Sequence, residues 1–115
     1  MNVPNRGIIK GLLTAAFATI LGLSAAQAAE DHKAEAMKHA EAAVSAGAAG
    51  NAAGVAEHAE AAKTHAAAAN AEKKNPHYDA AITSLNSAIE HGKMGHADIA
   101  KKSAEEAVTH LKAAP

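Results

Sequence analysis

Histidine is the residue type in this chain whose number and spacing most clearly suggest chemistry. Eight histidines occur in 115 residues, and they form sequence pairs whose members are seven or fourteen residues apart: His32 and His39, His58 and His65, His77 and His91, His96 and His110. Seven residues are close to two turns of an α-helix, so both members of each pair are expected on one helix face. Neutral imidazoles are typical ligands of copper, nickel and zinc ions.

The histidines are also placed symmetrically about two glycine-containing turns, Gly47 to Gly50 and Gly92 to Gly95. If each turn joins two antiparallel helices, histidines equally far from the turn lie at equal heights. This arrangement predicts four cross-helix pairs: His32 with His65, His39 with His58, His77 with His110, and His91 with His96. The alternative places the histidine faces between the second and third helices and between the first and fourth. The turn symmetry favours the hairpin arrangement, and the alternative stays open here.

A cross-helix pair can chelate an ion, whereas two histidines seven residues apart on one helix cannot. Such residues are separated by about 10 Å along the helix axis, but metal–nitrogen bonds are about 2 Å long. Two carboxylates could complete a coordination sphere: Glu35 lies between His32 and His39, and Glu106 lies one turn before His110. In an open site of two imidazoles, a carboxylate and water, the Irving–Williams order favours Cu(II) over Ni(II) and Zn(II).

The first 28 residues have the pattern of a secretory signal peptide. Arg6 and Lys10 precede an uncharged apolar stretch, residues 11–23, and a small-residue cleavage site follows at 26–28. The apolar stretch is shorter than the roughly 20 residues that span a bilayer, and no later stretch could serve as a stop-transfer segment, so we expect no membrane insertion after cleavage. The pattern predicts a periplasmic protein with a single domain at residues 29–115.

The composition of residues 29–115 limits both the partners and the size of the core. Without Arg6 and Lys10, nine lysines face twelve acidic residues, and this net charge of −3 argues against a nucleic-acid partner. About a third of these residues are alanine, and Tyr78 is the only one of the three aromatic types Phe, Trp and Tyr that remains. We therefore expect one domain with a thin core, most simply a monomer.

The pattern of Ala, Glu and Lys predicts an all-α fold with four helices at residues 30–46, 52–70, 76–91 and 96–113. A shift of 45 residues superimposes the first helical hairpin on the second, which predicts an up-down-up-down bundle of two repeated hairpins. With histidine at heptad position g, positions a and d hold Lys33 and a set of otherwise apolar or small residues: Ala36, Ala40, Ala43, Gly47, Ala52, Val55, Ala59, Ala62, Ala66, Tyr78, Ala81, Leu85, Ala88, Ala97, Ala100, Ala104, Ala107 and Leu111.

Motifs of catalysis are missing from the sequence. It contains no Glu-x-x-His pair of the di-iron bundles, no Cys-x-x-Cys-His haem motif and no glycine-rich phosphate loop. We therefore predict a protein that is not an enzyme.

Three stretches resemble the periplasmic small metal-binding protein family described from nitrifying bacteria. They are KHAEAAV at 38–44, EHGKMGH at 90–96 and AEEAVTHLKA at 104–113. The resemblance implies a four-helix bundle that binds several divalent ions, copper prominently, in buffering or scavenging. The chain differs from the family pattern at Ala46, Asn51, Ser84 and Ser103, where a fuller lattice could carry histidine, which argues against a high metal capacity.

Two other interpretations do not involve metal. In the first, the bundle is a structural or interaction protein whose partner is unknown and whose histidines are solvated or sense pH. In the second, the helices lie on membranes, but alanine-rich faces are too weakly apolar to favour this.

Overall fold

A computed structural model describes residues 31–115, so the predicted signal peptide at residues 1–28 lies outside the described part. This part folds into four α-helices: α2 at His32–Ala48, α3 at Ala52–Glu72, α4 at Pro76–Lys93 and α5 at Ala97–Ala113. Residues 31–115 contain no β-strand. All the predicted helix boundaries lie within two residues of those observed. The all-α prediction is therefore confirmed.

Local hydrogen bonds explain where three of the helices begin. The Asp31 carboxylate accepts a hydrogen bond from the backbone N–H of Ala34, and the Asn51 side chain accepts one from Gly54. The Asn75 side chain caps α4, in which Pro76 takes the first position, where its missing N–H costs nothing. These caps satisfy backbone groups that would otherwise lack partners at the helix ends.

The short turns that follow α2 and α4 need glycine. Gly50 has a φ of 77° and Gly95 a φ of 84°, a left-handed conformation that side chains with a Cβ rarely adopt. Each turn leaves three residues between helices, at 49–51 and 94–96. Consecutive helices are therefore held side by side.

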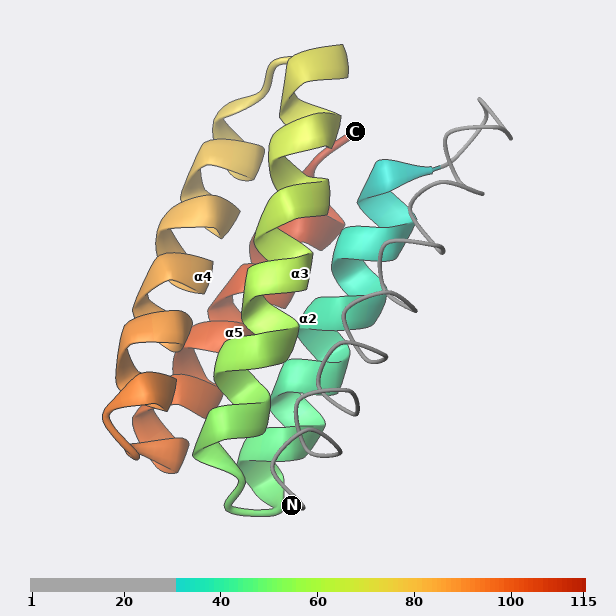
Figure 1. Ribbon diagram of the computed structural model, residues 1–115. Coiled ribbons are helices and arrows are strands. Elements are labelled where there is room, and N and C mark those ends of the chain that lie inside the picture. Colours follow the sequence, from blue (N-terminus) through green and yellow to red (C-terminus); the bar gives the residue numbers. More distant parts are fainter. Residues whose placement is uncertain (1–30) are drawn as a thin grey trace, which may run out of the picture. The chain divides into compact units, whose positions relative to one another are not determined.

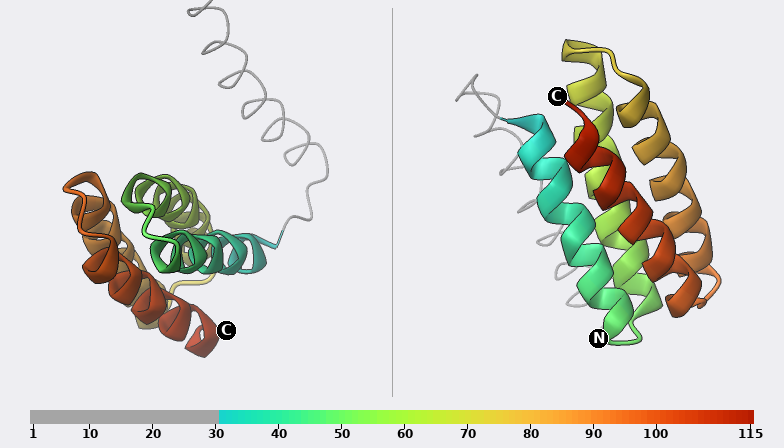
Figure 2. Two further views of the ribbon diagram at one scale, coloured as in Figure 1. Left: turned by 90° about the horizontal axis from the view of Figure 1, so that it is seen from below. Right: turned by 180° about the vertical axis from the view of Figure 1, so that it is seen from behind.

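The four helices pack as a bundle. Each helix contacts the next one in the chain, and α5 also contacts α2, so the helices surround a common core. Figure 1 shows α3 between α2 and α4, and the view from behind in Figure 2 shows α5 beside α2. Within residues 31–115, none of the helices is long and apolar enough to cross a membrane.

The core consists mainly of alanine. Almost all the predicted a and d positions are buried, and Leu85, Leu111 and Val55 are the largest side chains that are fully buried. Ala52 and Ala97, at the starts of α3 and α5, are only half-buried. Since alanine buries little apolar area, hydrophobic burial contributes less stability per residue here than in a leucine-rich bundle.

Lys33 occupies a predicted core position and finds a polar partner there. Its ammonium group donates a hydrogen bond to the backbone oxygen of Ala114 at 2.7 Å. The Tyr78 hydroxyl donates another, also 2.7 Å long, to the backbone oxygen of Pro115. The residues after α5 are therefore hydrogen-bonded to both α2 and α4.

Candidate metal centre

All four predicted cross-helix histidine pairs are brought together. Two pairs lie between α2 and α3, and two lie between α4 and α5, as the hairpin arrangement predicted. The ring centroids are 5.4 Å apart for His32 and His65, 6.4 Å for His39 and His58, 5.9 Å for His77 and His110, and 5.7 Å for His91 and His96. The histidine faces are therefore not those of the alternative arrangement.

Two of these pairs already bring ring nitrogens into contact. The Nδ1 atoms of His32 and His65 are 3.2 Å apart, and those of His91 and His96 are 3.5 Å apart. Because one nitrogen must donate and the other accept, at least one ring of each pair carries a nitrogen with an available lone pair. Such a nitrogen is what a metal ion binds.

The pairs of the first hairpin are not separate from each other. The rings of His39 and His65 are stacked, with centroids 5.6 Å apart and an angle of only 5° between their planes. His65 thus contacts both His32 and His39. The four imidazoles between α2 and α3 form one continuous row.

The direction of helical side chains explains the additional contact. His32, at the start of α2, lies beside His65 in the second half of α3. Side chains on a helix lean towards its N-terminus. His39 therefore leans towards the level of His65, and His65 leans towards the level of His39. The opposite diagonal, from His32 to His58, is lengthened by the same effect.

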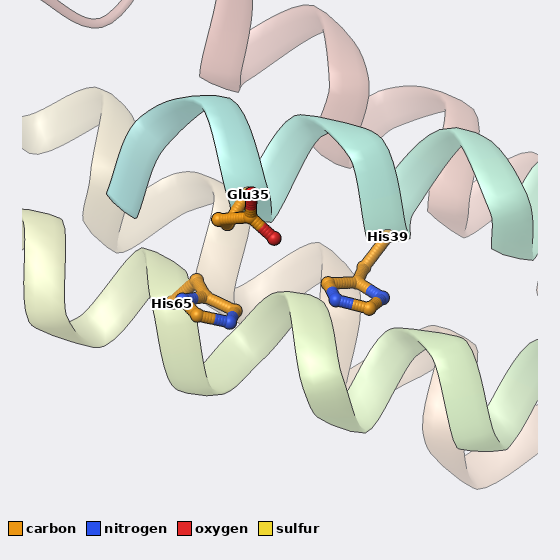
Figure 3. A group of neighbouring side chains, drawn as sticks. All are labelled: Glu35, His39 and His65. Atoms are coloured by element: carbon orange, nitrogen blue, oxygen red, sulfur yellow. The ribbon is translucent and has the colours of Figure 1, made fainter. Parts of the chain in front are cut away.

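Glu35 completes a group of three possible ligands. One carboxylate oxygen of Glu35 and one nitrogen each of His39 and His65 lie within 4.8 Å of one another. Glu35 and His39 extend from α2 towards His65 on α3, as Figure 3 shows. His65 is buried, with 9% of its surface exposed, while the other two side chains are half-buried. In residues 31–115 this is the only such group of three.

The environment of His39 favours its neutral form. Burial lowers the pKa of His39 below the usual 6.5, and the neighbouring rings of His65 and His58 lower it further when charged, while Glu35 acts in the opposite direction. A neutral ring is the form that coordinates metal, so His39 can act as a ligand at a lower pH than an ordinary histidine.

The two predicted carboxylates differ in their placement. Glu35 joins the group of three, whereas Glu106 is exposed and belongs to no such group within residues 31–115. The sequence interpretation also missed Glu72, whose carboxylate lies 3.9 Å from the Nε2 atom of His32. Glu72 follows His65 by seven residues, so continuing the heptad lattice past its last histidine on α3 would have identified it.

The second hairpin keeps its two histidine pairs apart. Fourteen residues separate His77 from His91, and at the intermediate level the chain carries Ser84 and Ser103, both buried. The Ser103 hydroxyl is 2.9 Å from that of Ser87. No histidine therefore connects the two pairs of this hairpin, in contrast to the first.

A family model described as small metal-binding protein matches residues 8–114. No curated protein sequence matches the chain.

Proposed function

Because the chain belongs to the small metal-binding protein family, we propose that it is a periplasmic protein that binds divalent transition metal ions between its helices. The ions are Cu(II) foremost, with Ni(II) and Zn(II) behind it in the Irving–Williams order. The role is buffering, storage or detoxification of metal. The observation that carries the proposal is that all eight histidines of the chain lie in pairs, three between helices and one, His91 with His96, across the turn between α4 and α5.

The nitrogen spacing in the closest pairs fits chelation. Two nitrogens bound to one ion at about 2.0–2.1 Å, with an angle between square-planar and tetrahedral values, lie roughly 2.9–3.4 Å apart. The Nδ1 atoms of His32 and His65 are separated by 3.2 Å, and those of His91 and His96 by 3.5 Å. Small ring rotations, together with transfer of the donor ring's proton from Nδ1 to Nε2, bring both lone pairs onto one ion at these pairs.

Several sequence features support the remaining parts of the proposal. The leader-like pattern at residues 1–28 supports export, and the net charge of −3 in residues 29–115 supports the absence of a nucleic-acid partner. The matching histidine pairs about two glycine turns support an antiparallel bundle of two repeated hairpins. We propose a monomeric carrier that performs no catalytic step.

Equilibrium dialysis of residues 29–115 against Cu(II), Ni(II) and Zn(II) at pH 7.5 tests the proposal. We expect more than one Cu(II) per chain, with Cu(II) held most tightly. The control replaces one histidine of each pair with asparagine, at His58, His65, His96 and His110, and should lose most of this capacity. Fewer than one Cu(II) per chain at micromolar metal, or equal binding by the control, would show that the histidine pairs do not hold the metal.

A further inference from the structure

We propose that the first ion to bind this protein occupies a diagonal site formed by Glu35, His39 and His65. An ion at this site prevents ion binding at the two level pairs, which are the pairs of histidines at equal heights on α2 and α3. The inference rests on the proposed metal-binding function and assigns its tightest site. The level pairs, His32 with His65 and His39 with His58, each share one histidine with the diagonal site.

The geometry favours the diagonal over the level pair at His39. The rings of His39 and His65 are closer than those of His39 and His58, at 5.6 Å against 6.4 Å. The rings of His32 and His65 are 5.4 Å apart, so at His65 the ring distances do not decide and the carboxylate of Glu35 does. A carboxylate oxygen of Glu35 lies within 4.8 Å of a nitrogen of each ring of the diagonal site. Neither level pair of this hairpin belongs to a group of three possible ligands among residues 31–115.

The donor set also favours the diagonal site for a divalent ion. Two imidazoles and a carboxylate are an established ligand combination for Zn(II) and other divalent metals. The carboxylate contributes a negative charge that offsets part of the ion's charge beside the buried ring of His65. The Glu72 carboxylate lies 3.9 Å from Nε2 of His32, whereas His65 contacts the Nδ1 atom of that ring, so this carboxylate forms no group of three with the pair. An ion between the two nitrogens of a level pair therefore draws its other ligands from water.

Sharing of ligands makes these sites mutually exclusive. A neutral imidazole has one nitrogen with a free lone pair, so it binds one ion at a time. When His39 and His65 hold an ion, His32 and His58 each lose their level partner. The first hairpin then holds one ion with three protein ligands, whereas the second hairpin offers two independent two-histidine pairs. The protein therefore has two classes of site.

A matched pair of carboxylate variants tests the role of Glu35. Glu35 precedes His39 by four residues and Glu106 precedes His110 by four, but only Glu35 belongs to the group of three. First-ion affinity is measured for residues 29–115 by chelator competition, with less than one Zn(II) or Cu(II) per chain at pH 7.5. E35Q should weaken the affinity about tenfold or more, a change of about 1.4 kcal/mol, while E106Q should leave it unchanged.

Histidine variants separate the diagonal from the level pairs. H39A and H65A should each abolish the first binding event, whereas H32A and H58A should preserve it. Ring-nitrogen NMR shifts of the unaltered protein with substoichiometric Zn(II) give a second measurement that requires no substitution. The shifts should move first at His39 and His65.

Three results would overturn the inference. The first is that H32A loses as much first-ion affinity as H65A, and H58A as much as H39A. The level pairs would then hold separate ions. The second is a first ion that shifts the rings of the second hairpin. The third is that E35Q and E106Q have the same first-ion affinity. In all three cases the protein still binds metal, whereas failure of the unaltered protein to bind any of these ions overturns the proposed function itself.

Discussion

Metal should raise the thermal stability of this protein by an amount that depends on which pair binds it. An ion that binds only the folded state adds about 2.7 kcal/mol when its free concentration is 100 times the dissociation constant. For a domain of 60–100 residues, each kcal/mol raises the melting temperature by about 4–8 °C. One ion in the first hairpin should therefore raise the melting temperature by roughly 10–20 °C.

The number of residues between the two ligands along the sequence decides how much of this stabilisation is observed. His39 and His65, the imidazole ligands proposed for the first hairpin, are 26 residues apart on different helices, so they meet only when α2 and α3 are packed together. His91 and His96 are five residues apart across one turn, so an unfolded chain can bring them together at little cost. Binding to the unfolded state reduces stabilisation, and H91A should therefore keep most of the metal effect that H65A loses.

Melting curves from helical circular dichroism, with and without Zn(II), measure this effect for residues 29–115 and for both variants. The rise at pH 7.5 should fade as the pH falls through about 6 to 5, because histidines must be neutral to bind and their ordinary pKa is near 6.5. An unchanged melting temperature at pH 7.5, an equal rise at pH 5, or a larger loss in H91A than in H65A would refute the reasoning.

The metal-free protein offers three further tests of the structure. His39 should titrate below pH 6.5 when its ring is followed by NMR. Because the unfolded chain then binds more protons than the folded one just below pH 6.5, the metal-free protein should lose stability as the pH falls from about 6.5. The H39A variant should lose less stability over the same pH range. Tyr78 should ionise above pH 10, because burial, and to a smaller extent the charges of Asp31 and Glu72, raise its pKa. Its phenolate absorbance can be followed alone, since the chain has one tyrosine and no tryptophan. A midpoint at or below pH 10 would contradict the packing of Tyr78. G92A should destabilise the protein by about 1–2 kcal/mol in urea unfolding, because overpacking outweighs the helix propensity gained: the added Cβ would lie 2.7 Å from the backbone oxygen of Ala52 and 2.9 Å from the backbone nitrogen of Ala56. The A53G variant, at an exposed helical position, measures the difference in helix propensity between alanine and glycine without a packing effect. A G92A protein as stable as the original would show that α3 and α4 can separate freely.

Helix boundaries could be predicted from capping residues and composition, and histidine pairing could be predicted from spacing. Asn75 and Pro76 fix the start of α4, and placing histidine at heptad position g assigned most of the core correctly. Heights on two helices joined by a three-residue turn follow from counting residues away from that turn. This is why all four pairs were found without any knowledge of the packing.

The diagonal contact between His39 and His65 could not be found by counting. A heptad lattice gives each residue a face and a height, but it omits the tilt of side chains towards the helix N-terminus. That tilt brings one diagonal together and separates the other, and it matters only where pairs follow at seven residues, as in the first hairpin. The partner of Lys33 was missed for a similar reason, because its hydrogen bond goes to the chain beyond α5 rather than to a heptad neighbour.

The alanine core links the proposed sites to the low stability expected of the metal-free protein. Small residues at Ala36, Ala40 and Ala62 allow α2 and α3 to approach closely, since helix separation depends on the side chains between the axes. Close approach is what lets half-buried imidazoles on the edge of the interface reach across it. Larger core residues would stabilise the bundle, but they would also separate the rings. A protein that binds ions between helices in this way is therefore expected to depend on those ions for part of its stability.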